Sequence, residues 1–353
     1  MRAKSYLVMA VLLIVTLLVG LIPAAVAQAQ TADPSRAKIV VANRGSGSLA
    51  IIDAKSGALR ETLALPPGAH QPEPMYVVYT PAKNRVWVGD RANDRVVAFD
   101  ANHFSVETIV PVGAGVFHMW ADPQNEQLWV VSDRDKTISV VELKSQSLLA
   151  TIPIPADLQA SGGIPHDVTL DPLRNLAFVT VNGVAGPHDY VVQYSTETFE
   201  ELGRAAVGKD AHLSLARQDN QLYVPCQGSS VVFVLNRESM QTLTTIELPG
   251  AHGAGMARDG QVFYTTNIPG GGAQGLFAID TNTNTILGPA TGAPYPVPHN
   301  IALTPDSNTL FLTHSGPTAD KVTIYSASQQ NPLPVLVGEV TVGLNPFGLA
   351  YVP

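Results

Sequence analysis

The sequence contains a single cysteine and few charged residues. One Cys among 353 residues excludes an intramolecular disulfide framework, and it also excludes a c-type haem attachment motif, which needs two. Only 14% of the residues are charged, and Asp plus Glu (29) outnumber Lys plus Arg (21), which gives a formal net charge of −8. A chain of this charge is not expected to bind nucleic acid through the phosphate backbone.

Familiar catalytic signatures are missing as well. The sequence has no Gly-x-Ser-x-Gly elbow, no P-loop and no dinucleotide-binding fingerprint. No segment after residue 30 has a convincing helical period. Hydrophobic residues make up 45% of the chain, and 29 Gly and 27 Pro are scattered along it, which indicates many tight turns rather than a disordered tract.

The first 27 residues are typical of a secretion signal. Arg2 and Lys4 form a basic start, residues 6–22 are apolar, and Ala25-Val-Ala27 offers small residues for cleavage. We therefore predict a signal peptide at 1–27 and a linker at 28–36. The apolar run is long enough that an uncleaved anchor stays open. Either way the body is expected outside the cytoplasm, whether secreted, periplasmic or on the cell surface, and only this segment would contact a membrane. Loss of residues 1–27 changes the charge to 19 − 29 = −10.

One short stretch recurs along the whole chain. From Met75 to Phe347 is 272 residues over six steps, a period of about 45, which is typical of a repeat array. The best copies are residues 163–172 (Gly-Ile-Pro-His-Asp-Val-Thr-Leu-Asp-Pro) and 295–305. The other copies start at Pro74, Phe117, Ala211, Ala251 and Asn345.

Each repeat predicts four short strands. The recurring stretch alternates apolar and polar residues, and three further runs rich in β-branched and aromatic residues follow it, with turn signals about every ten residues. Seven such repeats predict an all-β, seven-bladed β-propeller over residues 37–353. The first predicted strand, at residues 38–43, is a second strand, and the last, at residues 348–352, is a first strand. The N-terminal strands are therefore expected to pair with the C-terminal strand and close the ring.

The second-strand signature carries a family resemblance. Tyr264-Thr-Thr-Asn267 and Val40-Val-Ala-Asn43 resemble the tetrapeptide of the YVTN family of seven-bladed propellers, and the Pro-His first strands and Ile-Asp strand ends also match. The resemblance covers about residues 37–353 and implies the fold. It leaves the activity open, because the family and its relatives include extracytoplasmic binding proteins, surface-layer proteins, lactonases and the propeller domain of nitrous oxide reductase.

Histidines gather on one face of the predicted propeller. Strand alternation within a blade places eight of the nine on the face where first strands begin, and only His103 on the other. Because first strands are innermost, their first residues are expected to line the mouth of the central channel. The predicted ring contains Met75, His118, His166, His212, His252, His299 and Phe347, with Phe117 as the alternative to His118. Second-strand ends add His314 and Cys226 beside this ring.

Converging imidazoles with a nearby thiol favour a transition-metal site. Neutral imidazole and thiolate are ligands for copper or zinc, so the candidate ligands are His118, His166, His212, His252, His299, His314 and Cys226, with Asp167 or Asp133 orienting a ring nitrogen. The other interpretation is ordinary channel histidines with no cofactor, because duplication of a repeat copies a packing residue around the ring. The sequence has no Cys/His motif for the electron-entry copper of nitrous oxide reductase, and its predicted ring lacks a full set of His, so that activity is not assigned.

Arginines follow the second strands of three successive blades. Arg44, Arg91 and Arg134 could bind a carboxylate or phosphate, or each could pair with a neighbouring acid.

Three functions remain open. The preferred interpretation is an extracytoplasmic, monomeric binding protein whose protein partner or small anionic ligand meets the channel mouth. The alternative is a lactonase-like hydrolase or lyase in which a histidine acts as acid or base and the arginines hold an anionic substrate. The third is a surface scaffold whose channel has no task.

Overall fold

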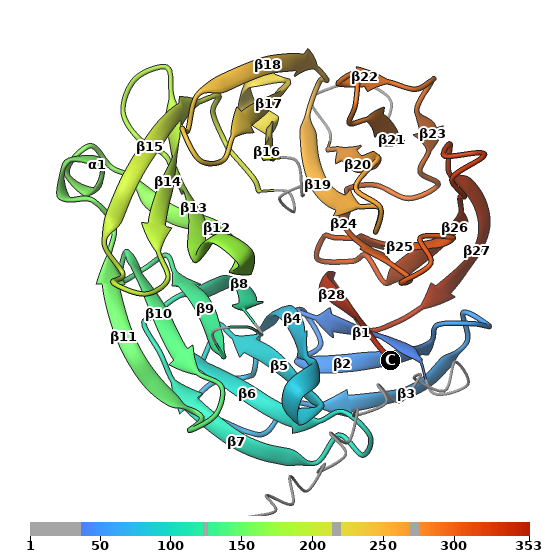
Figure 1. Ribbon diagram of the computed structural model, residues 1–353. Coiled ribbons are helices and arrows are strands. Elements are labelled where there is room, and N and C mark those ends of the chain that lie inside the picture. Colours follow the sequence, from blue (N-terminus) through green and yellow to red (C-terminus); the bar gives the residue numbers. More distant parts are fainter. Residues whose placement is uncertain (1–36, 123, 125, 214–219, 269–274) are drawn as a thin grey trace, which may run out of the picture. The chain divides into compact units, whose positions relative to one another are not determined.

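The computed structural model describes residues 37–353 except 123, 125, 214–219 and 269–274. The predicted signal peptide and linker lie outside the described residues. Residues 37–353 form seven antiparallel sheets arranged around a central channel (Figure 1), as the repeat predicts. None of the helices in the described part is long and apolar enough to cross a bilayer.

The innermost strands line the channel. They are β4 (Pro74–Thr80), β8 (Val116–Asp122), β12 (Ile164–Asp171), β19 (Ala251–Met256), β24 (Pro298–Leu303) and β28 (Pro346–Val352). In the remaining blade this position is marked by the isolated bridge between Ala211 and Cys226.

The second strands pack directly outside them. They are β1 (Lys38–Asn43), β5 (Arg85–Asp90), β9 (Gln127–Ser132), β13 (Leu176–Asn182), β16 (Gln221–Cys226), β20 (Val262–Asn267) and β25 (Thr309–His314).

The third strands are almost as buried as the second. They are β2 (Ser48–Asp53), β6 (Arg95–Asp100), β10 (Thr137–Glu142), β14 (Asp189–Ser195), β17 (Val231–Asn236), β21 (Gly275–Asp280) and β26 (Lys321–Ser326).

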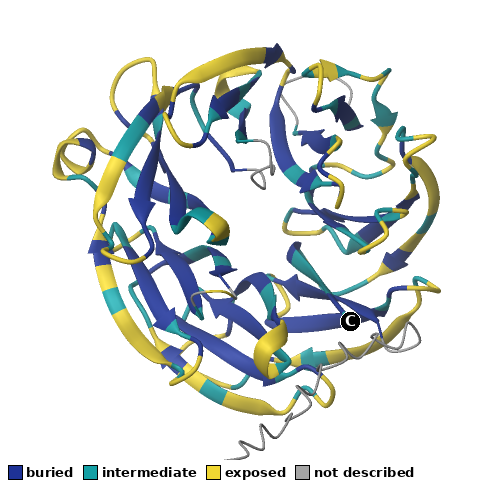
Figure 2. Ribbon diagram, in the orientation of Figure 1, coloured by how far each residue is buried: buried dark blue, intermediate teal, exposed yellow. Residues whose placement is uncertain are grey.

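The outermost strands face solvent. They are β3 (Leu59–Ala64), β7 (Val106–Pro111), β11 (Ser147–Pro153), β15 (Glu201–Val207), β18 (Thr242–Glu247) and β27 (Val335–Thr341), and in one blade the short pair β22 (Thr285–Ile286) and β23 (Thr291–Gly292). Figure 2 shows this gradient, with buried inner strands and an exposed rim. The core therefore lies between neighbouring blades, where Trp87, Trp129 and Phe178 are fully buried.

Short helices interrupt the β architecture, which the sequence pattern did not predict. The helix α1 (Ala156–Ala160) joins two blades, and single 3₁₀ turns η1 (Pro81–Lys83), η2 (Pro172–Arg174) and η3 (Gln227–Ser229) occupy loops. Proline begins η1 and η2, where its fixed φ suits the first helical position. These elements are too short to give a helical period.

The ring closes between the two ends of the propeller chain. The C-terminal strand β28 pairs antiparallel with β1, and its sheet order is β28-β1-β2-β3. The partners run from Lys38 with Val352 to Asn43 with Pro346. The predicted closure by N-terminal strands and the C-terminal strand is confirmed, and it gives β1 a hydrogen-bonding partner on each side.

A bulge recurs near the start of each inner strand. In β4, β8, β12, β19, β24 and β28, one extra residue separates two paired positions, as between Pro165 and Val168. A bulge bends a strand and redirects its side chains. The first bulged residue is Met75, Phe117, His166, His252, His299 or Phe347, and the corresponding residue after the bridge at Ala211 is His212.

Threonines of the second strands stabilise three of these bulges. The backbone N–H groups of Asp167, Gly253 and Asn300 donate to the hydroxyls of Thr180, Thr266 and Thr313 at 2.8, 2.8 and 3.1 Å. A bulge removes these N–H groups from the sheet ladder, and a buried donor needs a partner. The threonine in the second-strand signature thus positions the residues that line the channel.

Candidate functional site

All the first bulged residues except Met75 carry rings, and these rings form a belt around the channel. We call Phe117, His166, His212, His252, His299 and Phe347 the imidazole belt. Successive ring centroids along it lie 4.4, 4.8, 3.9, 4.5 and 4.2 Å apart, and Phe347 returns to Phe117 at 6.0 Å. Four of the five histidines that the sequence predicted at the channel mouth therefore lie in one connected belt.

The fifth, His118, lies one residue further along its strand. The bulge in β8 places Phe117 in the belt, which is the alternative that the sequence left open. The Nδ1 atom of His118 accepts a hydrogen bond from the Val168 N–H at 3.2 Å, and its ring stacks on Trp120. Burial lowers the pKa of His118, so it is neutral at neutral pH.

His314 and Cys226 lie apart from the belt. The two ring nitrogens of His314 contact the Pro296 carbonyl at 3.2 Å and the Thr323 hydroxyl at 2.9 Å, so both are already engaged. Cys226 is fully buried in the apolar core between two blades, its Sγ lies 3.4 Å from the Val224 carbonyl, and burial raises the pKa of its thiol to about 12. These contacts fit structural roles better than metal binding.

The carboxylate of Asp167 is buried among three histidines. One oxygen lies 3.0 Å from His166 Nδ1, and the other lies 3.5 Å from His212 Nδ1 and accepts from the Leu213 N–H at 3.0 Å. Burial would raise the pKa of Asp167, but the neighbouring histidines outweigh burial and hold it well below its usual range. Asp167 is therefore an anion inside the channel.

Adjacent histidines of the belt have opposite protonation. Burial alone would lower the pKa of His212, but the carboxylates of Asp167 and Asp210 raise it to about 9, so His212 is a cation at neutral pH. Burial and the nearby His212 put the pKa of His252 well below its usual value and lower that of His299 to about 3, so both are neutral. Opposed pKa shifts of this kind often mark sites of acid–base chemistry.

A cavity of about 780 Å³ opens above the belt, at the end where the first strands begin. We call it the upper cavity. It is lined by His252, His299 and Phe347 from the belt, and by Arg44, Glu73 and Gln227 from the surrounding loops. A volume of this size accommodates a small organic ligand.

Hydrogen bonds assign different tautomers to the two histidines of the upper cavity. Asn300 Nδ2 lies 2.6 Å from His299 Nδ1 and also donates to the Phe347 carbonyl at 3.2 Å, which identifies it as the amide nitrogen. His299 Nδ1 is therefore an acceptor, and its proton is on Nε2. His252 Nδ1 lies 2.9 Å from the Gln227 side-chain oxygen, which places the proton on Nδ1 and leaves Nε2 unprotonated.

The three predicted arginines do not share one cavity. Arg44 lines the upper cavity and pairs with Glu73 at 2.6 Å through Nε and Nη2. Arg91 pairs with Asp133 of the next blade at 2.9 Å and bonds two backbone carbonyls. Arg134 is exposed and lines a separate hollow. Arg44 is thus the predicted arginine best placed to contact a ligand near the belt.

Three side chains could hold a metal ion. His166, Asp167 and His212 each offer one ligand atom, and these atoms lie within 4.8 Å of one another. His212 Nε2 lies 3.6 Å from an Asp210 carboxylate oxygen. At metal sites the second ring nitrogen of a ligating histidine often contacts a carboxylate in this way. His118, His252 and His299 are outside this group.

Sequence reasoning missed the residues that set these protonation states. Asp210, Gln227 and Asn300 each act on a belt histidine, yet their contacts depend on loop geometry between blades. Only Asn300 carried a signal, because it directly follows the Pro-His pair.

Comparisons with known proteins agree with this architecture. The family described as "Lactonase, 7-bladed beta-propeller" matches residues 25–250. No curated protein matches the chain.

Similar solved structures share the fold. The Pseudomonas aeruginosa periplasmic gluconolactonase PpgL is 17% identical, with 90% of this chain and 99% of that chain covered and a TM-score of 0.70. A Lactobacillus plantarum protein is 14% identical, with 90% and 99% covered and a TM-score of 0.71. Hydrazine synthase from Kuenenia stuttgartiensis is 15% identical, with 78% and 89% covered and a TM-score of 0.65. Identities this low establish the fold alone.

Proposed function

Because the chain belongs to the family of seven-bladed β-propeller lactonases, we propose that it hydrolyses a cyclic ester of a sugar acid in the upper cavity. The observation that carries the proposal is the pair His252 and His299. They line one cavity with Arg44, and their free ring nitrogens differ in protonation. The gluconolactonase name of one structural neighbour, PpgL, agrees with this substrate class.

The chemistry assigns one role to each histidine. His252 Nε2 takes a proton from water as the oxygen attacks the lactone carbonyl carbon. The carbonyl oxygen becomes an oxyanion, which accepts a hydrogen bond from His299 Nε2–H. The ring C–O bond then breaks, and the leaving oxygen takes the proton back from His252. One water and one lactone thus yield one open hydroxy acid, and His252 returns to its starting state.

Arg44 would orient an anionic substrate. Its ion pair with Glu73 engages Nε and Nη2, which leaves Nη1 to contact a carboxylate or phosphate on the sugar acid. The adjacent His212 cation adds positive charge beside His252.

Acid release from a panel of sugar-acid lactones in a pH-stat tests the proposal. We expect hydrolysis faster than the spontaneous rate, and a loss of about 10²-fold or more in His252→Ala or His299→Ala. His103→Ala, an exposed residue on another loop, is the matched control and should keep full activity. Wild-type rates equal to the spontaneous rate across the panel would refute hydrolysis; binding without turnover would instead support the non-catalytic binding protein.

The group of His166, Asp167 and His212 favours a second candidate function, binding of copper or zinc. Two imidazoles and one carboxylate are a donor set that zinc accepts. Metal analysis after incubation with each ion and dialysis tests it. We expect one ion per chain in the wild type and none in Asp167→Ala, whereas an equal metal content in both proteins would exclude this site.

We also propose that the propeller acts outside the cytoplasm as a monomer. The basic, apolar and small-residue regions of 1–27 support export. The N-terminal mass of the protein from its native host would show whether this segment is removed, and light scattering would give the oligomeric state.

A further inference from the structure

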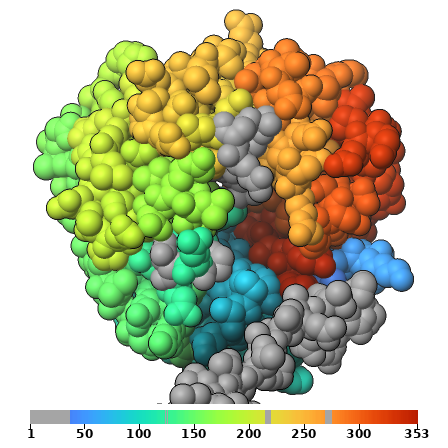
Figure 3. Space-filling model, in the orientation of Figure 1, coloured from blue at the N-terminus to red at the C-terminus, as the bar shows by residue number. Residues whose placement is uncertain are grey.

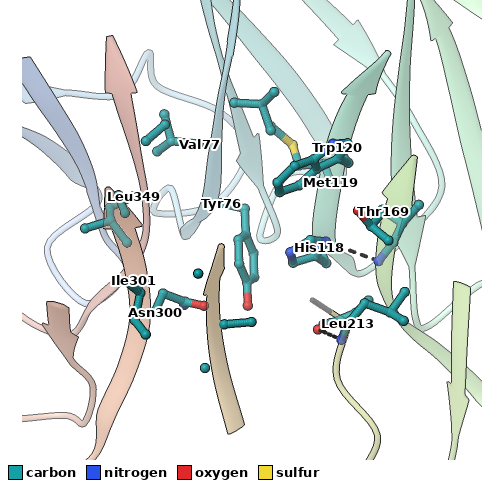
Figure 4. A pocket seen from close by; sticks show the side chains of 18 of the residues that line it. Tyr76, Val77, His118, Met119, Trp120, Thr169, Leu213, Asn300, Ile301 and Leu349 are labelled. Atoms are coloured by element: carbon teal, nitrogen blue, oxygen red, sulfur yellow. Dashed lines mark hydrogen bonds between the residues drawn. The ribbon is translucent and has the colours of Figure 1, made fainter. Parts of the chain in front are cut away.

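Two cavities flank the imidazole belt, and they differ in chemistry. The lower chamber, of about 440 Å³, lies on the other side of the belt from the upper cavity. Figure 3 shows a face of the propeller that is hollowed at the centre of the ring. Apolar and aromatic side chains such as Tyr76, Trp120 and Leu349 surround the lower chamber (Figure 4), and no Lys or Arg is among the described residues that line it. An acidic sugar derivative therefore finds no basic side chain there.

One cation and one anion line the upper cavity. Among the described Lys, Arg, Asp and Glu residues, only Arg44 and Glu73 contribute to its wall. Its uncharged polar side chains include the amides of Gln71, Gln227 and Asn345, which can bind the hydroxyl groups of a sugar. The guanidinium and carboxylate charges of the wall therefore cancel before a substrate binds.

Both members of this ion pair are held in place by their surroundings. The guanidinium of Arg44 lies 5.5 Å from the centroid of the Phe347 ring. The backbone N–H of Glu73 donates to Asp90 Oδ1 at 2.9 Å, and its carbonyl accepts from the Arg91 N–H at 3.0 Å. A ligand in the upper cavity therefore meets the carboxylate together with the guanidinium, and never the arginine alone.

The ion pair leaves one donor and one acceptor for a ligand. Nε and Nη2 of Arg44 each lie 2.6 Å from Glu73 Oε1, so Nη1 remains as a donor and Glu73 Oε2 as an acceptor. The two side chains are 31% and 27% exposed, so a ligand can reach both. A carboxylate on Nη1 with a neighbouring hydroxyl on Oε2 would satisfy both atoms. A phosphate dianion on Nη1 would lie beside the Glu73 carboxylate, and repulsion between like charges opposes its binding.

We infer that Glu73 determines substrate charge: the upper cavity accepts a hydroxyl-rich sugar lactone with at most one negative charge and rejects a phosphorylated one. The inference rests on the lactone hydrolysis proposed above. Of the two anionic groups that Arg44 could hold, it chooses the carboxylate. Glu73 contacts the substrate but takes no part in bond making or breaking, so its effect belongs mainly to KM.

Hydrolysis of glucono-1,5-lactone and of its 6-phosphate tests this inference, because the two share one ring and differ only in the phosphate. Glu73→Gln keeps the shape of the side chain and an acceptor for Arg44, and it removes the negative charge. The ratio of kcat/KM for the phosphate to kcat/KM for the unphosphorylated lactone should rise about tenfold, mainly through a lower KM for the phosphate. An unchanged ratio would overturn the inference.

Glu201→Gln is the matched control. Glu201 pairs with Arg204 at 2.7 Å, and these side chains are 30% and 29% exposed, but neither is among the described residues that line the upper cavity. This variant should keep the wild-type ratio, and an equal rise in it would assign the effect to net charge instead. Arg44→Gln leaves Glu73 without its partner, so it should lower the ratio; a ratio at or above the wild-type value would count against the inference.

Calorimetric titration with gluconate and 6-phosphogluconate separates this inference from the proposed catalysis, because it needs no turnover. Relative to gluconate, Glu73→Gln should bind 6-phosphogluconate about tenfold more tightly than the wild type does. That result without any hydrolysis would refute the catalysis and keep the role of Glu73. Hydrolysis with an unchanged ratio would do the reverse. Equal relative affinities in both proteins, or binding by neither, would refute the role of Glu73.

Discussion

His212 and His252 are chemically identical neighbours whose ring centroids lie 3.9 Å apart, yet they titrate in opposite directions. Both are buried, which by itself lowers the pKa of a histidine. His212 has two carboxylates within 3.6 Å, whereas Gln227 beside His252 has no charge. Partners from neighbouring loops therefore decide which imidazole is an acid and which is a base.

The raised pKa of His212 predicts a specific pH dependence of stability. A histidine whose pKa rises from 6.5 to about 9 on folding stabilises the protein fully below pH 6.5, and this contribution is lost as pH rises through 9. The loss should be on the order of 3 kcal/mol in the free energy of unfolding. Denaturant unfolding at pH 6 to 9.5, in the presence of a chelator, measures it.

Two variants separate this contribution from other groups. His212→Gln should lose the pH dependence in this window, and the exposed His103→Gln should keep it. A wild-type slope that survives in His212→Gln would assign the effect to another residue.

The sequence predicted residue types better than residue contacts. Four histidines of the belt follow from their common place in the repeat, but His314 and Cys226 share only a strand end and lie elsewhere. The choice between Phe117 and His118 depended on one bulge, and a shift of one residue in a strand changes the face on which a side chain lies.

At the scale of the element, the bulged inner strand is the unit that builds the site. It presents one residue to the belt and the next to the cavity on the other side of the belt, as with His166 and Asp167, and the second-strand threonine accepts a hydrogen bond from the freed N–H group. The strand order and the ring closure could be predicted from the repeat, because each strand shows its hydrophobic pattern within a few consecutive residues. It did not reveal the bulges, which depend on pairing between strands.

A threonine-to-valine change should destabilise one such element. In Thr266→Val the buried N–H of Gly253 loses its acceptor at 2.8 Å, which should cost about 1–3 kcal/mol in unfolding free energy. Denaturant unfolding measures this loss, and Thr62→Val on the exposed strand β3 is the control. Equal stability of Thr266→Val and wild type would show that the hydroxyl does not hold the bulge.

Only glycine fits at position 253 in the bulge of β19. A Cβ atom at this position would lie 1.8 Å from the His299 carbonyl oxygen. Gly253→Ala should therefore displace β24 and separate His252 from His299. We expect a lower melting temperature together with lost lactone hydrolysis, whereas normal values of both would contradict this packing.

At the scale of the whole propeller, one strand pairing joins the two ends of a ring of seven sheets. Within β28, Phe347 is 6% exposed and Val352 is fully buried, and the pairing with β1 covers an otherwise open edge. The upper cavity takes residues from both ends of this chain, since Arg44 follows β1 and Phe347 lies in β28. The pairing of β28 with β1 thus closes the ring and also brings together the residues of the upper cavity.

Deletion of residues 346–353 tests the closure. Loss of one inner strand and of these buried side chains should remove most of the roughly 5–15 kcal/mol that stabilises a typical domain. We expect broad, low-temperature unfolding and rapid proteolysis. Val337→Ser on the outer strand β27, where the side chain is 60% exposed, should unfold like the wild type. Sharp, unchanged melting of the deletion would contradict the role of β28.

The pH dependence of kcat/KM for lactone hydrolysis, in the wild type and in His252→Gln, tests the central claim most directly. The pKa of His252 lies well below its usual value, so the wild-type rate should not fall as pH drops through the range in which an ordinary histidine becomes protonated, and His252→Gln should lose about 10²-fold or more. A wild-type rate that falls with an apparent pKa near 6.5, or a variant that matches the wild type, would contradict the assignment of His252 as the base.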